Sequence, residues 1–257
     1  MIPLGDDSPV IRTPVTTYLL IAVNVAVWLW VQGAGADAHR LAVTVCDLGM
    51  VPGELTHMAR VGESVPIGPG LACVVGAHSR IRFLTPLLSM FVHGGWMHLL
   101  GNMIYLAVFG RNVEDSMGRG RFLAFYLICG LVAGATHLAF NPDSPVPTVG
   151  ASGAISGVLG AFLILYPRVP VRMFVFIFIV RIRAWLVLVY WFALQALGGL
   201  SQLNEISPTV SGGTAVWAHV GGFLAGVALI RFFENSSFVD AQFTASMGNP
   251  VDRYARW

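Results

Sequence analysis

Charged side chains are scarce in this chain. They make up 11% of its 257 residues, whereas 56% are hydrophobic, and the mean hydropathy is +0.72. Soluble proteins carry roughly 25% charged residues. The scarcity excludes an ordinary soluble domain. Several separate apolar runs are long enough, or nearly so, to cross roughly 30 Å of hydrocarbon, and they predict a polytopic membrane protein.

Lysine is absent, so all 15 basic residues are arginine, and the net charge is only +2. The arginines are scattered along the chain, which argues against nucleic acid as a partner. The three cysteines form no metal-binding pattern. Cys46 and Cys73 share one connector and could pair if that connector faces an oxidising compartment, while Cys129 lies in an apolar run. We expect unpaired thiols.

The apolar runs predict an all-α bundle of six transmembrane helices in a domain that covers residues 15–233. Residues 1–14 form a polar N-terminal segment, and residues 234–257 form a polar C-terminal tail of low order. The first connector, residues 33–83, is interrupted by prolines and glycines and so cannot form a transmembrane helix. It is also too apolar for a simple linker, so we expect it in the membrane interface. The predicted spans are residues 15–30, 96–110, 122–140, 152–166, 184–200 and 214–233.

Two polar features within these segments have structural explanations. Asn24 in the first span predicts a hydrogen bond between helices. The run 173–180 is too short to cross, and it is followed by Arg181 and Arg183. Each arginine would cost about 2.5–3.5 kcal/mol at mid-membrane. We therefore expect an interfacial element there, and a short charged connector at residues 111–121.

The distribution of arginine predicts the orientation in the membrane. Six spans put both termini on one side. Most arginines lie in connectors 111–121 and 168–183 and after residue 230, and none lies in connectors 141–149 and 201–213. The positive-inside rule then predicts cytoplasmic termini. Ser152 would lie near the exoplasmic end of its helix.

Ser152 opens the fourth span directly after a proline-rich loop, and glycines stand close to it on both sides. The first turn of a helix has free backbone N–H groups and favours negative charge. That setting suits a nucleophile whose reaction creates an oxyanion. Gly150 and Gly153 would allow a close approach to the hydroxyl. Taken alone, however, Gly153 and Gly157 are better explained as a helix-packing face.

Other polar groups lie in the spans, where such residues are candidates for function. His98 and Asn102 are four residues apart and share a helix face. His219 precedes Gly222 and Gly226, whose smooth face can pack on that of Gly153 and Gly157 and bring Ser152 and His219 to a common depth.

These groups suit acyl transfer. His219 would take the proton of Ser152 and return it to the leaving amine. The Ser152 amide, His98 and Asn102 are candidate donors to the oxyanion. As an alternative, each polar group could serve only to form a hydrogen bond between helices. We expect structural roles for His93, as a hydrogen-bond partner that fixes its loop, for His137, and for Ser156, which packs or back-bonds.

Three stretches together resemble the signatures of the rhomboid intramembrane serine proteases. They are His93-Gly-Gly-Trp-Met-His98-Leu-Leu-Gly-Asn102, Gly150-Ala-Ser152-Gly153 and Ala218-His219-Val-Gly-Gly222-Phe-Leu-Ala-Gly226. The resemblance covers roughly residues 84–233. It implies a Ser152–His219 dyad without a carboxylate, an oxyanion hole from His98, Asn102 and the Ser152 amide, and membrane helices as substrates. We expect a serine protease that requires no metal and no cofactor.

The chain departs from this pattern at Ser156, where some members carry a tyrosine that supports the histidine ring, and no Trp-Arg pair lies in the first connector. The competing hypothesis is an inactive relative that binds membrane clients. A transporter or an aspartyl protease is disfavoured because the six spans hold no carboxylate, and a metalloprotease because no His-Glu-x-x-His stretch exists. We expect a multi-pass protein of a bacterial plasma membrane.

Overall fold

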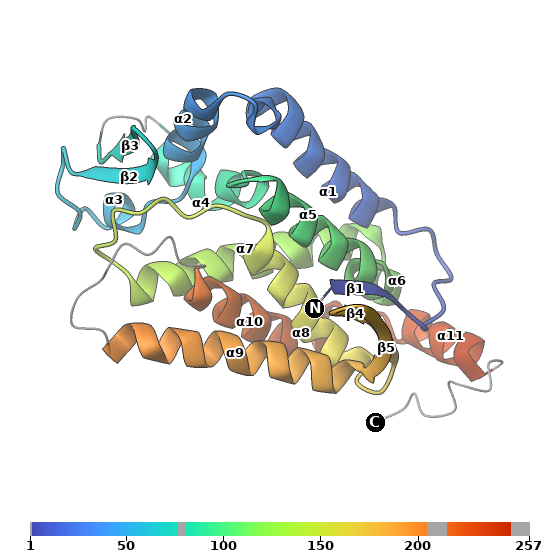
Figure 1. The fold of residues 1–257 in the computed structure, drawn as a ribbon. Coiled ribbons are helices and arrows are strands. Elements are labelled where there is room, and N and C mark those ends of the chain that lie inside the picture. The colour runs from blue at the N-terminus through green and yellow to red at the C-terminus, as the bar shows by residue number, and fades with distance from the viewer. Residues whose placement is uncertain (1, 77–80, 205–214, 248–257) are drawn as a thin grey trace.

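Residues 2–76, 81–204 and 215–247 are described by the computed structural model, and helices dominate them (Figure 1). Two small antiparallel sheets accompany the helices. The longer helices are α1 (Val15–Ala26), α5 (Trp96–Tyr105), α7 (Arg119–Phe140), α8 (Ser152–Leu165), α9 (Ala184–Asn204) and α10 (Val216–Phe233). The shorter ones are α2 (Ala38–Leu48), α3 (Pro52–Leu55), α4 (Thr85–Leu88), α6 (Arg111–Met117) and α11 (Ser236–Met247).

Each of the six predicted spans is helical over nearly all of its described part. The first continues from α1 through the π-helical turn η1 (Val27–Val31), and the second continues from α5 through η5 (Leu106–Gly110). Among the described helices, α7, α10 and the Ala184–Ser201 part of α9 are long and apolar enough to cross a membrane, while Val15–Val31 and Ser152–Leu165 are shorter apolar helices. Residues 205–214, which include the start of the sixth predicted span, lie outside the described residues.

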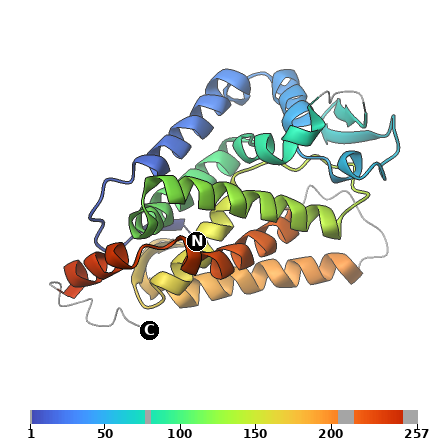
Figure 2. The ribbon, with the colours of Figure 1, turned by 180° about the vertical axis from the view of Figure 1, so that it is seen from behind.

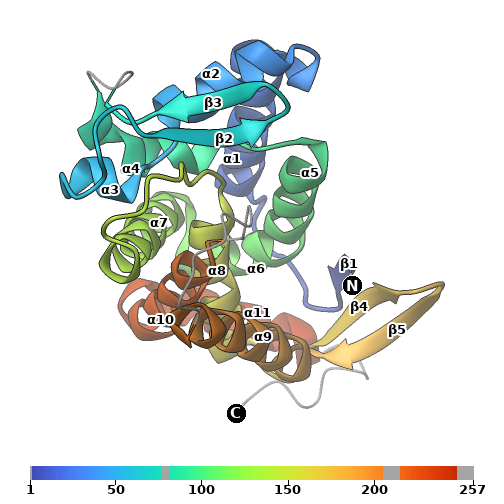
Figure 3. The same ribbon diagram turned by 60° about the vertical axis from the view of Figure 1, so that its left-hand side comes forward.

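Helix α8 occupies the middle of the bundle, with α5, α7, α9 and α10 around it (Figure 3). Every residue from Gly153 to Phe162 is buried. Its 14 residues span only about 21 Å at 1.5 Å per residue. A helix that is apolar on all sides is buried in a protein core or in a membrane. Helix α8 is shorter than the roughly 30 Å of hydrocarbon, and the helices around it cover its apolar surface.

Glycine lets α8 and α10 touch through their backbones. A Cβ atom added to Gly222 would collide with the carbonyl oxygen of Gly153, and one added to Gly226 would collide with that of Gly157. On its other side, Gly157 lies against the side chain of Cys129 in α7. The small-residue faces predicted to meet therefore do meet, and any larger side chain at these positions would push the helices apart.

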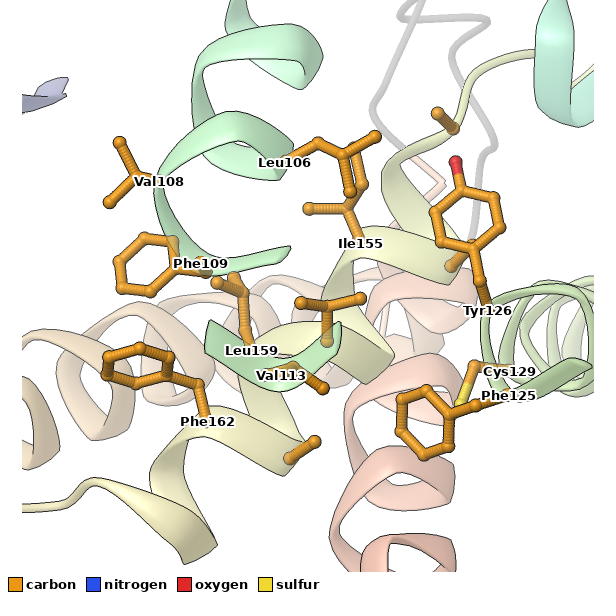
Figure 4. Close-up of a cluster of buried hydrophobic side chains, with 14 of the residues drawn as sticks. Leu106, Val108, Phe109, Val113, Phe125, Tyr126, Cys129, Ile155, Leu159 and Phe162 are labelled. Carbon is orange, nitrogen blue, oxygen red and sulfur yellow. The ribbon is translucent and has the colours of Figure 1, made fainter. Parts of the chain in front are cut away.

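Below this contact the bundle closes on large apolar side chains, shown in Figure 4. Phe109 and Phe162 pack edge to face with their ring centroids 4.9 Å apart. Phe125, Tyr126 and Cys129 of α7 contribute fully buried side chains from the other side of α8. Dense packing of this kind fixes the position of α8 against the helices that surround it.

Residues 111–117, expected as part of a charged connector, instead form helix α6 with buried acidic side chains. Glu114 is 2% exposed, and its carboxylate accepts hydrogen bonds from the amides of Thr16 and Thr17, at 2.9 and 2.7 Å. Asp115 accepts from the amides of Ile11 and Arg12, at 2.8 and 3.1 Å. Glu114 thus satisfies free N–H groups in the first turn of α1, while Asp115 binds the segment just before that helix. Together they hold the start of α1 to the end of the second predicted span.

The all-α expectation is wrong for the connector between α8 and α9. Strands β4 (Pro170–Val175) and β5 (Phe178–Arg183) form a hairpin, and β1 (Ile2–Asp6) pairs with β4, which gives the order β1-β4-β5. In the apolar run 173–180, apolar side chains lie on both faces of the sheet only near the hairpin turn. Along β4 the side chains alternate, with Val171 and Met173 buried and Arg172 exposed, as in a half-buried strand. The hairpin stands out sideways from the bundle at the start of α9 (Figure 3).

The first connector also holds strands, β2 (Ser64–Gly68) and β3 (Leu71–Val74). Cys46 in α2 and Cys73 in β3 form a disulfide with a Cα–Cα distance of 5.4 Å, so the expectation of unpaired thiols is wrong for this pair. The fold brings them together because β3 packs beside α2, which their separation of 27 residues did not reveal. Cys129 is free and buried.

Two further expectations are corrected. The C-terminal tail is ordered as α11 through Met247, and residues 248–257 lie outside the described residues. Gln242 of α11 is buried and donates to Asp115 at 2.9 Å, which gives the tail a fixed contact. Asn24 makes no bond between helices among the described residues, because its amide nitrogen donates to the Leu20 carbonyl of its own helix at 2.7 Å. Figure 2 shows α11 extending beyond the bundle from behind.

We expect Glu114→Ala to lower the free energy of unfolding by about 1–3 kcal/mol, because it leaves the buried amides of Thr16 and Thr17 without acceptors. Thermal unfolding in detergent micelles measures the loss. The matched control is Glu234→Ala, whose carboxylate pairs with exposed Arg231 at 3.0 Å and should change stability by less than about 0.5 kcal/mol. Equal melting temperatures for the two variants would contradict this account.

Candidate active site

The side chains of Ser152 and His219 form a hydrogen bond across the α8–α10 contact. The distance from Ser152 Oγ to His219 Nε2 is 2.8 Å. Ser152 is the first residue of α8, and His219 lies in the first turn of α10. Gly153 follows Ser152 by one residue in α8, and Gly222 follows His219 by three residues in α10. Because Gly222 lies against the Gly153 carbonyl, the two helices begin at a common depth. The hydroxyl and the imidazole therefore meet where both helices start.

The loop before α8 presents Ser152 at the helix start. The amide of Gly150 donates to the Ser89 carbonyl at 2.8 Å, and Met50 and Thr148 form a β-bridge between this loop and the first connector. Gly150 has a φ of +122°, which side-chain-bearing residues rarely adopt. The chain thus enters α8 through a fixed turn. The Ser152 amide lies in the first helical turn, where a backbone N–H has no acceptor within the helix.

Two N–H groups from α5 converge on Gly150. His98 Nδ1 accepts a hydrogen bond from the Gly94 amide at 3.3 Å. Since a neutral imidazole carries one proton, His98 Nε2 is then the donor. His98 Nε2 lies 2.6 Å, and Asn102 Nδ2 3.6 Å, from the point where a Cβ on Gly150 would stand. Glycine at this position, two residues before Ser152, therefore leaves room for the His98 ring, while Asn102 Nδ2 stands at an ordinary contact distance.

Asn102 is an unused donor. Its side chain is buried, and its Nδ2 has no hydrogen-bond partner among the residues that the structure describes. An unsatisfied buried amide group costs about 1–3 kcal/mol. Such a group suits a site that binds a negatively charged oxygen only during a reaction.

The far side of the His219 ring contacts α9. His219 Nδ1 lies 2.9 Å from Gln195 Oε1, and the Trp191 ring lies 5.9 Å from the imidazole between centroids. Gln195 was not among the candidate residues predicted from the sequence. A signal was present, because it is the only side-chain amide in the run 184–200, and polar groups within spans are candidates for function.

The remaining polar candidates have other partners. Ser156 donates to the Ser152 carbonyl at 2.6 Å, which is the back-bonding expected of it. His137 Nε2 lies 3.0 Å from Thr148 Oγ1 and ties α7 to the loop before α8. The loop at His93 is held through its backbone, which exchanges hydrogen bonds with the Gln32 side chain at 2.9 and 2.6 Å. The His93 ring packs edge to face on the His98 ring, with the two centroids 5.1 Å apart, and its ring nitrogens have no hydrogen-bond partner among the described residues.

Chemically, the arrangement offers a hydroxyl bound to an imidazole and a separate group of N–H donors close by. Within the described parts of the chain, no group of three or more His, Cys, Asp or Glu side chains is placed to hold a metal ion. The chemistry available to these side chains is nucleophilic attack assisted by a base, with hydrogen bonds to a developing oxyanion.

Comparison with known proteins identifies one domain family. The family model of the rhomboid domain matches residues 78–235, more than half of the chain. Rhomboid protease GluP of Bacillus subtilis is 44% identical over 82 residues, 32% of this chain and 15% of the relative. RHOMBOID-like protein 2 of Arabidopsis thaliana is 32% identical over 163 residues, 61% of this chain and 43% of the relative.

A third relative, Rhomboid protein 1, mitochondrial, of Saccharomyces cerevisiae, is 29% identical over 143 residues, 54% of this chain and 38% of the relative. The matched stretches thus cover less than half the length of each of these three relatives. Some relatives are named proteases and others are named only as rhomboid-like proteins.

We expect Gly150→Ala to lower the free energy of unfolding by about 1–3 kcal/mol, because the new Cβ meets His98 Nε2 and the positive φ strains a non-glycine residue. Thermal unfolding in detergent measures it. Gly101→Ala is the matched control, since a Cβ at that helical glycine meets nothing within 4 Å and should be neutral or stabilising. The account fails if Gly150→Ala is as stable as this control.

Proposed function

The chain belongs to the rhomboid family, and from that premise we propose that it is an intramembrane serine endopeptidase. It would hydrolyse peptide bonds in or near transmembrane segments of other membrane proteins through an acyl-enzyme. The observation that carries this proposal is the 2.8 Å hydrogen bond between Ser152 Oγ and His219 Nε2. A serine hydroxyl becomes nucleophilic when a neutral histidine accepts its proton.

In the proposed reaction, Ser152 Oγ attacks the carbonyl carbon of the scissile bond while its proton passes to His219 Nε2. The carbonyl oxygen becomes an oxyanion, which accepts hydrogen bonds from the Ser152 amide, His98 Nε2 and Asn102 Nδ2. Each such donor is worth about 10²–10³ in rate. As the tetrahedral intermediate collapses, the protonated His219 gives its proton to the leaving amine, and the acyl group stays on Ser152.

Water completes the proposed cycle. It attacks the acyl carbon while His219 again accepts the proton, and a second oxyanion forms at the same donors. When this intermediate collapses, Ser152 leaves and regains its proton from His219. The cycle consumes one water for each peptide bond and needs neither a metal nor a cofactor.

We place this reaction near the exoplasmic face of a six-span domain, residues 15–233, with both termini in the cytoplasm. The disulfide between Cys46 and Cys73 supports this orientation independently of the arginines, because disulfides persist in oxidising compartments. It lies in the first connector, which pairs with the loop before Ser152. That connector would then lie in the exoplasmic interface.

The β4–β5 hairpin would lie at the opposite, cytoplasmic face. At its turn, Phe176 is 91% exposed and Ile177 is 78% exposed. Arg181 and Arg183 follow in β5, before α9 begins. Apolar side chains beside arginines suit a contact with lipid and its phosphate groups. A bacterial plasma membrane stays a prediction, because the family's relatives include mitochondrial and chloroplastic proteins.

The test is cleavage of a transmembrane-helix substrate by the purified protein in liposomes. We expect Ser152→Ala and His219→Ala each to lower kcat by about 10³-fold or more, and Asn102→Ala to lower it by about 10²–10³-fold. Substrate affinity should change little, because these groups act on the reacting bond. Product bands identified by mass spectrometry provide the readout.

Ser156→Ala is the matched control, since its hydroxyl only bonds to its own helix, and it should keep wild-type activity. Cleavage that persists undiminished in a folded Ser152→Ala variant would overturn the proposal. A wild-type protein that binds membrane helices without cleaving any would favour the inactive, client-binding alternative.

A further inference from the structure

Gln195 supplies the acceptor that a Ser–His pair without a carboxylate would otherwise lack. Its Oε1 lies 2.9 Å from His219 Nδ1, on the side of the ring opposite to Ser152. We propose that Gln195 is a positioning residue that holds His219 in the tautomer with the proton on Nδ1. The proposal rests on the proposed function, because it concerns the same histidine.

The tautomer matters because a neutral imidazole carries one proton on either of two nitrogens. The Ser152 hydroxyl can pass its proton only to a ring nitrogen with a free lone pair. An amide oxygen accepts hydrogen bonds and cannot donate them, so Gln195 Oε1 favours a proton on Nδ1. Nε2 is then left unprotonated, facing the hydroxyl at 2.8 Å.

A glutamine also suits the later steps of the reaction. When Nε2 takes the proton of Ser152, both ring nitrogens carry one, and the Nδ1–H bond to Gln195 is kept. The amide oxygen carries a partial negative charge that stabilises the positive ring, and no proton moves to the amide. A carboxylate would do this more strongly, but burying a full charge among apolar helices costs more than burying a neutral amide.

Packing between α9 and α10 keeps Gln195 in place. Trp191 lies one helical turn before it on the same face of α9, and its ring contacts both His219 and Phe223 of α10, at centroid distances of 5.9 and 6.1 Å. One turn after Gln195, Gly199 packs on the Trp217 ring, 3.1 Å from where a Cβ would stand. The amide is thus held between two contacts that fix the register of α9 on α10.

The test compares Gln195→Leu, which keeps the size of the side chain but removes the acceptor, with Gln195→Glu, which keeps an acceptor oxygen. We expect Gln195→Leu to lower kcat about tenfold, the rate equivalent of one neutral hydrogen bond, with an unchanged KM. Gln195→Glu should recover most of kcat. Leu194→Ala, a change at an exposed neighbour on α9, should behave as wild type.

Nitrogen-15 NMR of histidine-labelled protein in lipid reports the tautomer directly, with the His219 signals assigned by their loss in His219→Gln. We expect a protonated Nδ1 in the wild type and in Leu194→Ala, and a shift toward a protonated Nε2 in Gln195→Leu. A purely structural role for Gln195 would lower folding yield without changing these signals.

The two proposals fail separately. An unchanged tautomer and an unchanged kcat in Gln195→Leu would overturn the role of Gln195 while leaving the protease intact. A wild-type protein without any cleavage activity, but with the expected tautomer change in Gln195→Leu, would overturn the protease and support the positioning of His219.

Discussion

The structure depends on a backbone contact between two helices that carry no bulky side chain where they cross. Gly222 and Gly226 of α10 lie against the carbonyl oxygens of Gly153 and Gly157 in α8. In a membrane, where lipid is as apolar as leucine, helices associate through close packing of this kind. The contact places Ser152 and His219 at the starts of the two helices, within hydrogen-bond distance of each other. The α8–α10 contact thus determines the depth of the Ser152 and His219 side chains and brings them together.

Around this contact, the polar groups of the site come from separate elements, and hydrogen bonds from neighbouring residues fix their positions. The amide of Gly94 fixes the His98 ring, Gln195 meets the far nitrogen of His219, and the Ser89 carbonyl holds the turn at Gly150. Preorganised donors cost no reorganisation when charge develops, and inside a membrane their effect is not weakened by bulk water. The buried Nδ2 of Asn102 has no hydrogen-bond partner among the described residues. This free donor supports the proposed role of Asn102 in binding the oxyanion.

Much of this could be predicted from the sequence, because apolar length and glycine spacing act locally. The helical segments and the meeting of the two glycine faces follow from such patterns, and so do the candidates Ser152 and His219. Features that depend on distant partners could not be predicted in this way. The Cys46–Cys73 bond needs β3 beside α2, and the three-stranded sheet needs β1, about 170 residues away, to pair with β4 of the β4–β5 hairpin. Gln195 was overlooked because its significance appears only once α9 is packed against His219.

The most direct test of the central claim links helix packing to the reactivity of the serine. It measures the rate at which a fluorophosphonate labels Ser152 in lipid membranes, with the labelled residue located by mass spectrometry. The wild type should be labelled at Ser152. Gly226→Leu, which lies more than one helical turn beyond the site, should insert into the membrane but be labelled far more slowly, because the larger side chain separates α10 from α8 and moves His219 away from Ser152. Gly120→Leu, at an open position of α7, should be labelled like the wild type. Labelling of Gly226→Leu at the wild-type rate, or no labelling of Ser152 in any of the three proteins, would contradict the account.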